Sequence, residues 1–286
     1  MSPAQSAAEP PLVSIVTPSL DQGRFIEEAI RSVVDQDYPR IEHIVVDGGS
    51  TDETLEVLER YPHLRWVSEP DRGQADAVNK GFAMASGEIF GWLNADDYYL
   101  PGAVAAAVAV MQETGCGLVH GGWRQVDEGG ETIGDVDVVP FDYPRQLEVE
   151  NRVAQPGAFF SREAFEAVGG LDLSYRYAMD YELWLKLGAR FDVRHVDRVQ
   201  AAYRYHPVSK SVADYEEFWP ETRRASRAHG GRFFSPMYTD YYLPKYRPHL
   251  FRLLLAARLV RRGDFRGLGA RVAGRIPPSR GGGRPA

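Results

Sequence analysis

The first 125 residues alternate short apolar segments with amphipathic ones, and this alternation constrains the fold more than any other feature of the sequence. Short runs rich in β-branched residues, typical of buried strands, occupy residues 12–17, 41–46, 64–68, 89–93 and 117–123. Between them, apolar residues recur at helical spacing over residues 24–35, 50–60 and 74–85, and from Pro101 onward. Such regular alternation predicts an α/β fold with a mostly parallel sheet covered by helices on both faces.

Local signals suggest where two of these helices begin and end. Ser50 and Glu53 have the spacing of a capping box, which predicts the start of the second helix. Gly87 follows the third helical segment and predicts its end, because glycine is favoured after the last helical turn.

The second half of the chain is less regular. A glycine-rich turn at residues 128–131 separates two stretches of alternating polarity, which predicts a hairpin. The segments 155–160, 191–196 and 199–205 have the composition of strands, and residues 179–188 have the periodicity of a helix.

Composition limits the class of protein. With 286 residues and 44% apolar residues, the chain can bury one large core. Its one cysteine, Cys116, excludes an intrachain disulfide and suits a reducing compartment. Residues 1–11 lack the basic and apolar regions of a secretory signal, and no segment has the ~18 consecutive apolar residues of a membrane span. We therefore expect a cytoplasmic protein.

Charge is distributed unevenly along the chain. Residues 223–286 contain 15 Lys and Arg against two acidic residues, a net charge of +13, so the preceding residues carry −20 of the total of −7. The apolar face of residues 250–260 is flanked by arginines, which suits a helix lying on an anionic membrane surface. The alternative is a helix whose leucines pack on the catalytic domain. The first alternative predicts a peripheral protein at the inner face of the membrane.

Polar clusters follow three of the first four predicted strands, at residues 17–21, 47–52 and 94–97. Ligands bind at the carboxyl ends of such strands. Asp96 and Asp97 are adjacent carboxylates, whose repulsion at ~4 Å costs about 4 kcal/mol at an effective dielectric near 20. A hard divalent cation, Mn²⁺ or Mg²⁺, shared with phosphate oxygens would offset this repulsion. The sequence lacks both the Gly-x-Gly-x-x-Gly motif of dinucleotide-binding enzymes and a P-loop.

Four segments in order, residues 13–19, 44–52, 69–81 and 92–97, resemble the inverting glycosyltransferases of family 2. A second block, residues 155–157, 169–172 and 179–185, extends the resemblance to about residue 210. The resemblance implies the GT-A fold, a Rossmann-like, mostly parallel sheet flanked by helices. It further implies a nucleotide-sugar-binding half at residues 11–122 and an acceptor-binding half of the same domain at 123–230. Residues 1–10 would then be a flexible N-terminus, and 231–286 a basic helical extension with a disordered end.

The resemblance also assigns a donor site. It implies a nucleotide pocket lined by Thr17, Pro18, Ser19, Asp21, Asp47, Gly48, Arg72 and Asp96. In that family the residue matching Asp47 accepts a hydrogen bond from the base, and an ionised carboxylate suits the imide N–H of uracil or thymine. The alternative for Asp47 is a turn residue, and for Arg72 a solvated loop arginine. Asp97 is expected to bind the metal, although Asn94 stands where many relatives have Asp.

A base must remove the proton of the acceptor hydroxyl as the sugar is transferred. The resemblance assigns this role to Asp180, although Met179 replaces the Glu that precedes it in the family; Glu182 is the fallback. The alternative for Asp180 is an acid favoured by the helix dipole. His206 matches a family position near the phosphates and is expected to be a third metal ligand, a phosphate donor or a structural residue.

Three further residues, Trp92, Gln155 and Trp184, are assigned to the acceptor and sugar pocket, with the alternative that the tryptophans belong to the core. The expected function is transfer of a sugar from a nucleotide diphosphate donor, UDP or dTDP rather than GDP, to an acceptor hydroxyl with inversion. The acceptor would be a carbohydrate or a lipid-linked molecule in cell-surface polysaccharide, glycolipid or glycoconjugate synthesis, and no nucleic acid would be involved. A metal-dependent nucleotidyltransferase and a non-catalytic nucleotide-sugar binding module are the alternatives.

Overall fold

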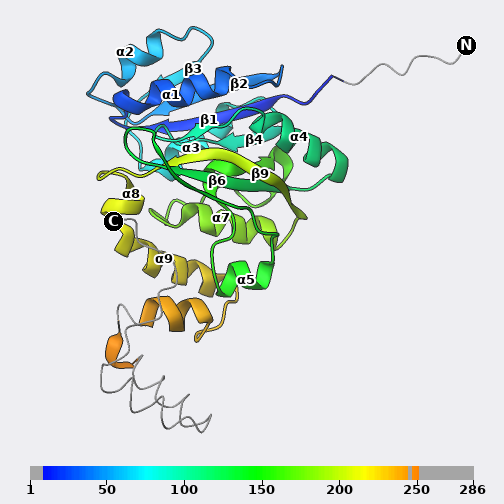
Figure 1. Cartoon of the computed structure of the whole chain (residues 1–286), viewed down its shortest axis with the longest axis vertical. Coiled ribbons are helices and arrows are strands. Elements are labelled where there is room, and N and C mark those ends of the chain that lie inside the picture. The colour runs from blue at the N-terminus through cyan, green and yellow to red at the C-terminus, as the bar shows by residue number, and fades with distance from the viewer. Residues whose placement is uncertain (1–8, 244–246, 251–286) are drawn as a thin grey trace, which may run out of the picture. The chain divides into compact units, whose positions relative to one another are not determined.

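In the part of the chain that the computed structural model describes, residues 9–243 and 247–250, nine strands form one mixed sheet (Figure 1). Eight of them follow each other across the sheet in the order β3 (Arg65–Ser68), β2 (Ile41–Asp47), β1 (Val13–Ser19), β4 (Ile89–Trp92), β8 (Ala158–Ser161), β6 (Leu118–Val126), β9 (Val193–Arg204) and β5 (Tyr98–Tyr99). The ninth, β7 (Thr132–Val136), forms the predicted hairpin with β6. The predicted α/β fold with a mostly parallel sheet is confirmed.

Strands β3, β2, β1 and β4 are parallel, as the alternation predicts. Their register aligns the strand ends, since Ser19 lies opposite Asp47, and Asp47 lies opposite Ser68. Strand β8 then enters antiparallel between β4 and β6. The sheet is therefore mixed at its centre, where β8 contributes the fully buried side chains of Phe159 and Phe160.

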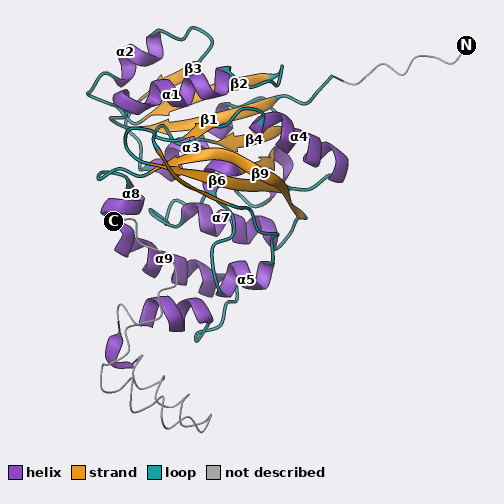
Figure 2. Cartoon of the chain, in the orientation of Figure 1, coloured by secondary structure: helices purple, strands orange, loops and turns teal. Residues whose placement is uncertain are grey.

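Helices cover both faces of the sheet (Figure 2). On one face, α1 (Gly23–Val34) and α4 (Ala103–Thr114) pack on β1, β4 and β6 through a core that includes Val33, Val104 and Phe159, and α2 (Thr54–Glu59) packs against α1. On the other, α3 (Gln74–Met84), α6 (Arg162–Ala167) and α7 (Met179–Gly188) meet in an aromatic cluster. Its rings are Phe82, Phe90, Phe160, Phe165 and Trp184.

Several local predictions differ from the structure. Ser50 and Glu53 do not form a capping box, because the Ser50 hydroxyl bonds Asp47 and α2 begins only at Thr54. The two strands predicted at 191–196 and 199–205 are one strand, β9, which continues through a bulge opposite Gly121 and Gly122. Residues 155–157 form a 3₁₀ turn, η1 (Gln155–Gly157), before β8.

Four α-helices of residues 123–231 are not predicted from the sequence. They are α5 (Tyr143–Glu148), α6, α8 (Lys210–Ala213) and α9 (Tyr215–Ala228). Asp142 caps α5 by accepting from the N–H of Arg145 at 2.8 Å. Helix α9 contains Pro220 as its sixth residue, inside the helix, so the hydrogen bond to the carbonyl of Glu216 is missing there.

The chain separates into two compact units, residues 1–231 and 232–286. The second unit contains the π-helix η2 (Met237–Tyr242), in which the N–H of Thr239 donates to the carbonyl of Ser235 at 2.9 Å. The helix predicted at residues 250–260 lies outside the described residues. The predicted division of the first unit at residue 122 stays a prediction.

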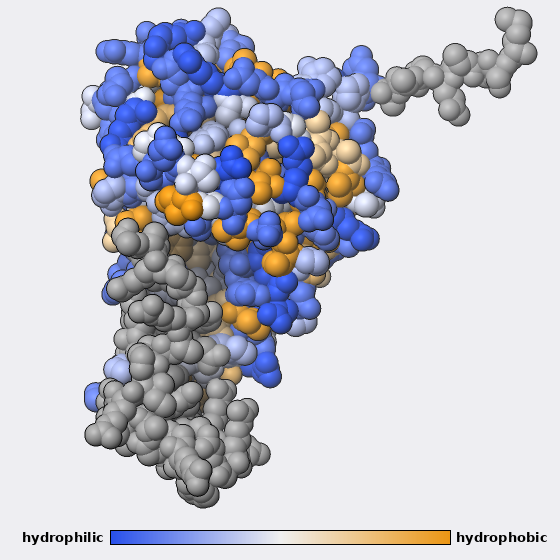
Figure 3. Space-filling model, in the orientation of Figure 1, coloured by the Kyte–Doolittle hydropathy of each residue, from blue (hydrophilic) through white to orange (hydrophobic). Residues whose placement is uncertain are grey.

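Among the described residues, no helix combines the length and apolarity that a lipid bilayer requires of a spanning segment. In Figure 3 the surface over α1 and α2 is mainly hydrophilic, and apolar side chains gather over the strands below them. Ile133, in β7, and Val139, after it, are exposed apolar residues.

The close approach of β1 to the segment before β4 gives a test of the packing. A Cβ atom added at Gly87 would lie 2.6 Å from the carbonyl oxygen of Leu12, and backbone cannot move aside as a side chain can. We predict that Gly87→Ala lowers the free energy of unfolding by about 1–3 kcal/mol. Urea denaturation monitored by circular dichroism measures the change.

Gly134→Ala is the matched control, because nothing lies within 4 Å of a Cβ at that position. Its effect should stay within about 0.5 kcal/mol. Equal midpoints for Gly87→Ala and the wild type would show that β1 and this segment are less tightly packed than described.

Candidate active site

The loops that follow β1 and β2 are bound to each other at the carboxyl edge of the sheet. The N–H of Asp21 donates to the Ser50 hydroxyl at 2.7 Å, and the Asp21 carboxylate accepts from the N–H of Thr51 at 2.8 Å. Asp21 has a φ of 50°, a left-handed conformation that Asp tolerates better than most residues. Asp21 thus links the two loops, and its carboxylate is already engaged in doing so.

Asp47 organises the loop after β2. Its fully buried carboxylate accepts hydrogen bonds from the N–H groups of Gly49 and Ser50, at 3.0 and 2.9 Å, and from the hydroxyls of Ser50 and Ser68. Three of these bonds end on Oδ2 and one on Oδ1, and no part of the residue is exposed. The geometry supports the alternative role of Asp47 as a turn residue.

The side chain of Thr17 faces the interior of the sheet. Its hydroxyl lies 2.9 Å from Nε2 of His43 on β2, and both residues are buried. Burial lowers the pKa of His43 to about 3, so the imidazole is neutral. The hydroxyl of Thr17 is therefore paired inside the sheet. Ser19, two residues further along, is buried with a hydroxyl that has no hydrogen-bond partner among the described residues.

The carboxylates of Asp96 and Asp97 have different environments. Asp97 is buried, and it accepts from the N–H of Arg204 at 3.0 Å and from the amide of Asn94 at 3.3 Å. Burial, and then the charge of Asp96, raise the pKa of Asp97 well above its usual range. The Asp96 side chain is 21% exposed, and its Oδ2 lies 3.0 Å from Nε2 of His206.

The pair formed by Asp96 and His206 fits a divalent metal ion. Oδ2 of Asp96 and Nε2 of His206 are 3.0 Å apart, so the two atoms would hold an ion together. Carboxylate and imidazole together suit Mn²⁺, whereas Mg²⁺ prefers oxygen ligands. Among the described residues, no group of three or more His, Cys, Asp or Glu side chains could hold an ion. The remaining ligands would come from substrate phosphates.

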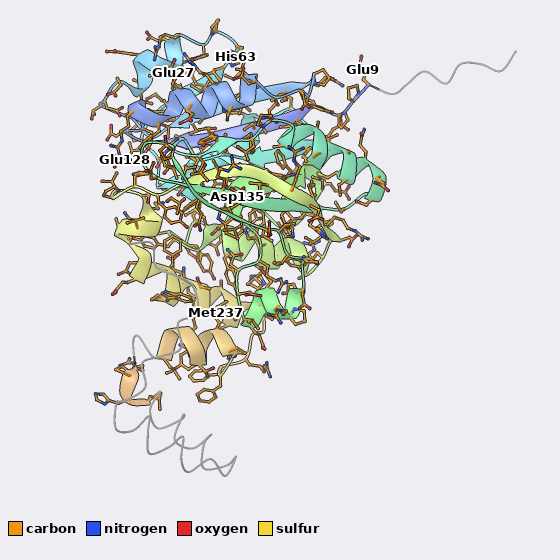
Figure 4. All side chains as sticks on the ribbon, viewed as in Figure 1. Glu9, Glu27, His63, Glu128, Asp135 and Met237 are labelled. Atoms are coloured by element: carbon orange, nitrogen blue, oxygen red, sulfur yellow. The ribbon has the colours of Figure 1, made fainter. Side chains whose placement is uncertain are left out.

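Arg204, which the sequence analysis did not single out, fixes the turn that carries both aspartates. Its side chain is 3% exposed, and its Nε donates to the carbonyl of Asp96 at 2.9 Å. The same guanidinium pairs with Glu28 of α1 and donates to the carbonyl of Glu128 at 3.0 Å. Glu128, labelled in Figure 4, lies in the β6–β7 hairpin loop and pairs with Arg24 of α1.

Asn94 is the centre of a side-chain network. Its Oδ1 accepts from Nε1 of Trp92 at 2.9 Å and from Gln74 at 2.8 Å, and its amide donates to Gln155 at 2.8 Å. Gln74 in turn accepts from Nζ of Lys210 at 2.8 Å. Trp92 and Gln155 are thereby held at the sheet edge, although both are less than one tenth exposed.

Asp180 lies in the first turn of α7 and is partly exposed. Desolvation raises its pKa to about 6, although the N–H of Tyr181, its own N–H and the charge of Lys210 all lower it. The start of α7 is positioned by Glu221 of α9, whose carboxylate accepts from the N–H groups of Tyr177 and Ala178 at 2.7 and 2.9 Å. A carboxyl with a pKa near neutrality is suited to accept a proton.

Three predicted site residues lie elsewhere. Glu182 is buried, 3.0 Å from Lys186 and 3.3 Å from His229 of the segment after α9, so it is not placed as a fallback base. Trp184 is fully buried against Phe160 in the core rather than in the acceptor pocket. Arg72 is exposed and pairs with Asp76 at 2.7 Å, which fits the solvated loop arginine.

Comparison with known proteins identifies the family. The profile of glycosyl transferase family 2 matches residues 14–169, which is more than half of the chain. An uncharacterized glycosyltransferase of Mycobacterium tuberculosis is 35% identical over 184 residues, covering 62% of this chain and 68% of that protein. Chondroitin synthase of Escherichia coli is 26% identical over 194 residues, covering 66% of this chain but only 28% of its own length.

Two solved structures share the fold. TarS of S. aureus in complex with UDP-GlcNAc superposes with a TM-score of 0.65 at 16% identity, covering 85% of this chain and 75% of that one. The mannosyltransferase PcManGT of Pyrobaculum calidifontis, solved with GDP-Man and Mn²⁺, gives a TM-score of 0.65 at 21% identity, covering 93% and 80%. At these identities the likeness shows the GT-A fold. Together with the family match, it shows that this chain is a glycosyltransferase and belongs to glycosyl transferase family 2.

Proposed function

We propose that the protein transfers a sugar from a UDP- or dTDP-sugar to an acceptor hydroxyl, with inversion and with Mn²⁺ or Mg²⁺ as cofactor. The observation that carries the proposal is the pairing of Asp96 with His206 at the carboxyl edge of the sheet. Asn94, two residues before Asp96, is bound through Gln74 to Lys210, whose charge lowers the pKa of Asp180. Family membership favours glycosyl transfer over nucleotidyl transfer and over a non-catalytic module.

On the donor side, Asp96 and His206 would hold the metal. This differs from the sequence prediction, which gives the metal to Asp97 with His206. The oxygens of Asp97 are used by Arg204 and Asn94, whereas Asp96 has an exposed oxygen beside the imidazole. When bound, the metal would neutralise charge on the leaving diphosphate. Asp97 would orient the turn from within the core.

On the acceptor side, Asp180 would act as the base. Its carboxylate takes the proton of the acceptor hydroxyl while the acceptor oxygen bonds the anomeric carbon and the bond to the diphosphate breaks. The nucleoside diphosphate leaves with the electron pair of that bond. Lys210 lies near enough to Asp180 to lower its pKa, and its bond to Gln74 connects this charge to Asn94 on the donor side. Lys210 and Gln74 are therefore positioning residues.

We further propose that the acceptor is a carbohydrate or lipid-linked molecule used in cell-surface polysaccharide, glycolipid or glycoconjugate synthesis. Chondroitin synthase among the relatives and the UDP-GlcNAc bound to TarS are consistent with such chemistry. The +13 charge of residues 223–286 supports an enzyme at the anionic inner face of the membrane, in the cytoplasm.

Asp180→Asn should separate binding from chemistry. We predict that kcat falls by roughly 10²–10⁴-fold, because the amide cannot accept the proton, while the dissociation constant for UDP with Mn²⁺ stays unchanged. Donor turnover with the best-binding nucleotide sugar and calorimetric titration of UDP measure the two quantities. Asp135→Asn, an exposed position on β7, is the matched control. Wild-type turnover by Asp180→Asn would refute the assignment of the base.

The pH dependence follows from the raised pKa of Asp180. Since only the ionised carboxylate is a base, kcat/KM should rise with pH through about 6 and then level off. Lys210→Met removes a charge that lowers this pKa, so its acidic limb should move to higher pH. A steady-state pH profile of both proteins tests this. A profile that is flat between pH 5 and 8, or a limb that moves to lower pH in Lys210→Met, would contradict the arrangement.

The metal site can be tested through binding alone. Mn²⁺ should tighten UDP binding by the wild type, and Asp96→Asn or His206→Ala should weaken the Mn²⁺-dependent binding roughly tenfold or more while leaving metal-free binding unaltered. Calorimetry with and without Mn²⁺ makes the comparison. If Asp97→Asn alone abolished the effect of Mn²⁺, and Asp96→Asn kept it, the sequence prediction of Asp97 as ligand would hold instead.

A further inference from the structure

The loop after β2 has no side chain at Gly48, and a neighbouring carboxylate fills the space. A Cβ atom built at Gly48 would lie 2.9 Å from Oδ2 of Asp71, which belongs to the segment after β3. The same position lies 3.4 Å from a methyl group of Leu20, in the loop after β1. Three loops of the carboxyl edge therefore meet at Gly48, with one carboxylate oxygen and one apolar side chain beside it.

Asp71 is held in a fixed position. Its Oδ1 accepts from the N–H of Gly73 at 2.7 Å, and Gly73 has a φ of 112°, which residues with a side chain rarely adopt. The N–H of Glu69 donates to the carbonyl of Asp47 at 3.0 Å, which ties this segment to the loop that contains Gly48. Within the described part of the chain, no hydrogen bond reaches Oδ2 of Asp71, and the residue is partly exposed.

Two other carboxylates near this point bind the loops to each other. The Asp47 carboxylate is fully buried and accepts from its own loop and from Ser68, and Oδ1 of Asp21 accepts from both the N–H and the hydroxyl of Thr51. Leu20 is 55% exposed, so its side chain is available to contact a ring that lies over Gly48. Oδ2 of Asp71 lies beside the exposed Leu20 and above Gly48, which has no side chain. This arrangement suits a planar ring with one N–H at its edge.

We propose that Oδ2 of Asp71 accepts the imide N–H of a uracil or thymine base that lies over Gly48 against Leu20. The inference rests on the proposed function and deepens it, since it names the residue that selects the donor nucleotide. Cytosine has an acceptor nitrogen where uracil has its imide N–H, so a carboxylate rejects it. Guanine presents two adjacent donors and would need both carboxylate oxygens, of which Oδ1 already binds Gly73.

Calorimetric titration of UDP and CDP, each with Mn²⁺, tests the proposal. The wild type should bind UDP at least tenfold more tightly than CDP, because a hydrogen bond to a charged acceptor is worth one to two decades of affinity. In Asp71→Asn the side chain can donate as well as accept, so UDP should weaken about tenfold or more and the preference over CDP should disappear. Asp37→Asn, an exposed position between α1 and β2, should keep the wild-type ratio.

A second variant distinguishes loss of the contact with the base from misfolding of Asp71→Asn. In the double variant Gly48→Asp with Asp71→Gly, the carboxylate moves to the other side of the same space, and UDP preference should return relative to Asp71→Gly alone. An unchanged ratio of UDP to CDP affinity in Asp71→Asn would overturn the inference while leaving the proposed function intact. Failure of the wild type to bind any nucleoside diphosphate would overturn both.

Discussion

The buried guanidinium of Arg204 is the contact on which the rest of the site depends. It joins the Asp96 carbonyl, Glu28 of α1 and the β6–β7 hairpin, and the backbone N–H of the same residue binds Asp97. A buried charge is tolerated only when its donors are satisfied, so the surrounding elements are held in one arrangement. Strand β9, from the irregular half of the domain, thereby fixes the turn that follows β4 in the regular half.

This arrangement reduces the electrostatic repulsion between the adjacent carboxylates of Asp96 and Asp97, because it places them in different environments. Asp97 points into the core, where burial raises its pKa and disfavours its charge, and Asp96 points to the edge of the sheet beside His206. Only one of the two is then presented to a ligand. A similar separation occurs between the loops after β2 and β3. The Asp47 carboxylate accepts hydrogen bonds from backbone and hydroxyl donors, whereas only Oδ1 of Asp71 accepts one. In both places one acid builds the loop and the other is free to bind.

The sequence predicted the fold because the periodicity of residues 12–123 is strong and local, and it placed the polar clusters at the correct edge of the sheet. It could not tell which member of a cluster faces the ligand. Asp47 and Asp97 were chosen by resemblance, yet their orientation depends on Ser68 and Arg204, which lie 21 and 107 residues away. Trp184 and Glu182 are buried on faces of α7 that pack against other elements. The sequence of this helix alone does not distinguish those faces from the face that carries Asp180. Gln74 lies in the segment 69–81, but only its contacts with Asn94 and Lys210 show that it connects the two sides of the site.

The position of Mn²⁺ in a crystal grown with UDP, located by its anomalous scattering, shows most directly which aspartate binds the metal. We predict a peak at ~2.1 Å from both Oδ2 of Asp96 and Nε2 of His206, in contact with the diphosphate. A peak bound to Asp97 with Asp96 turned away, or UDP bound with no metal between its phosphates and this edge of the sheet, would contradict it.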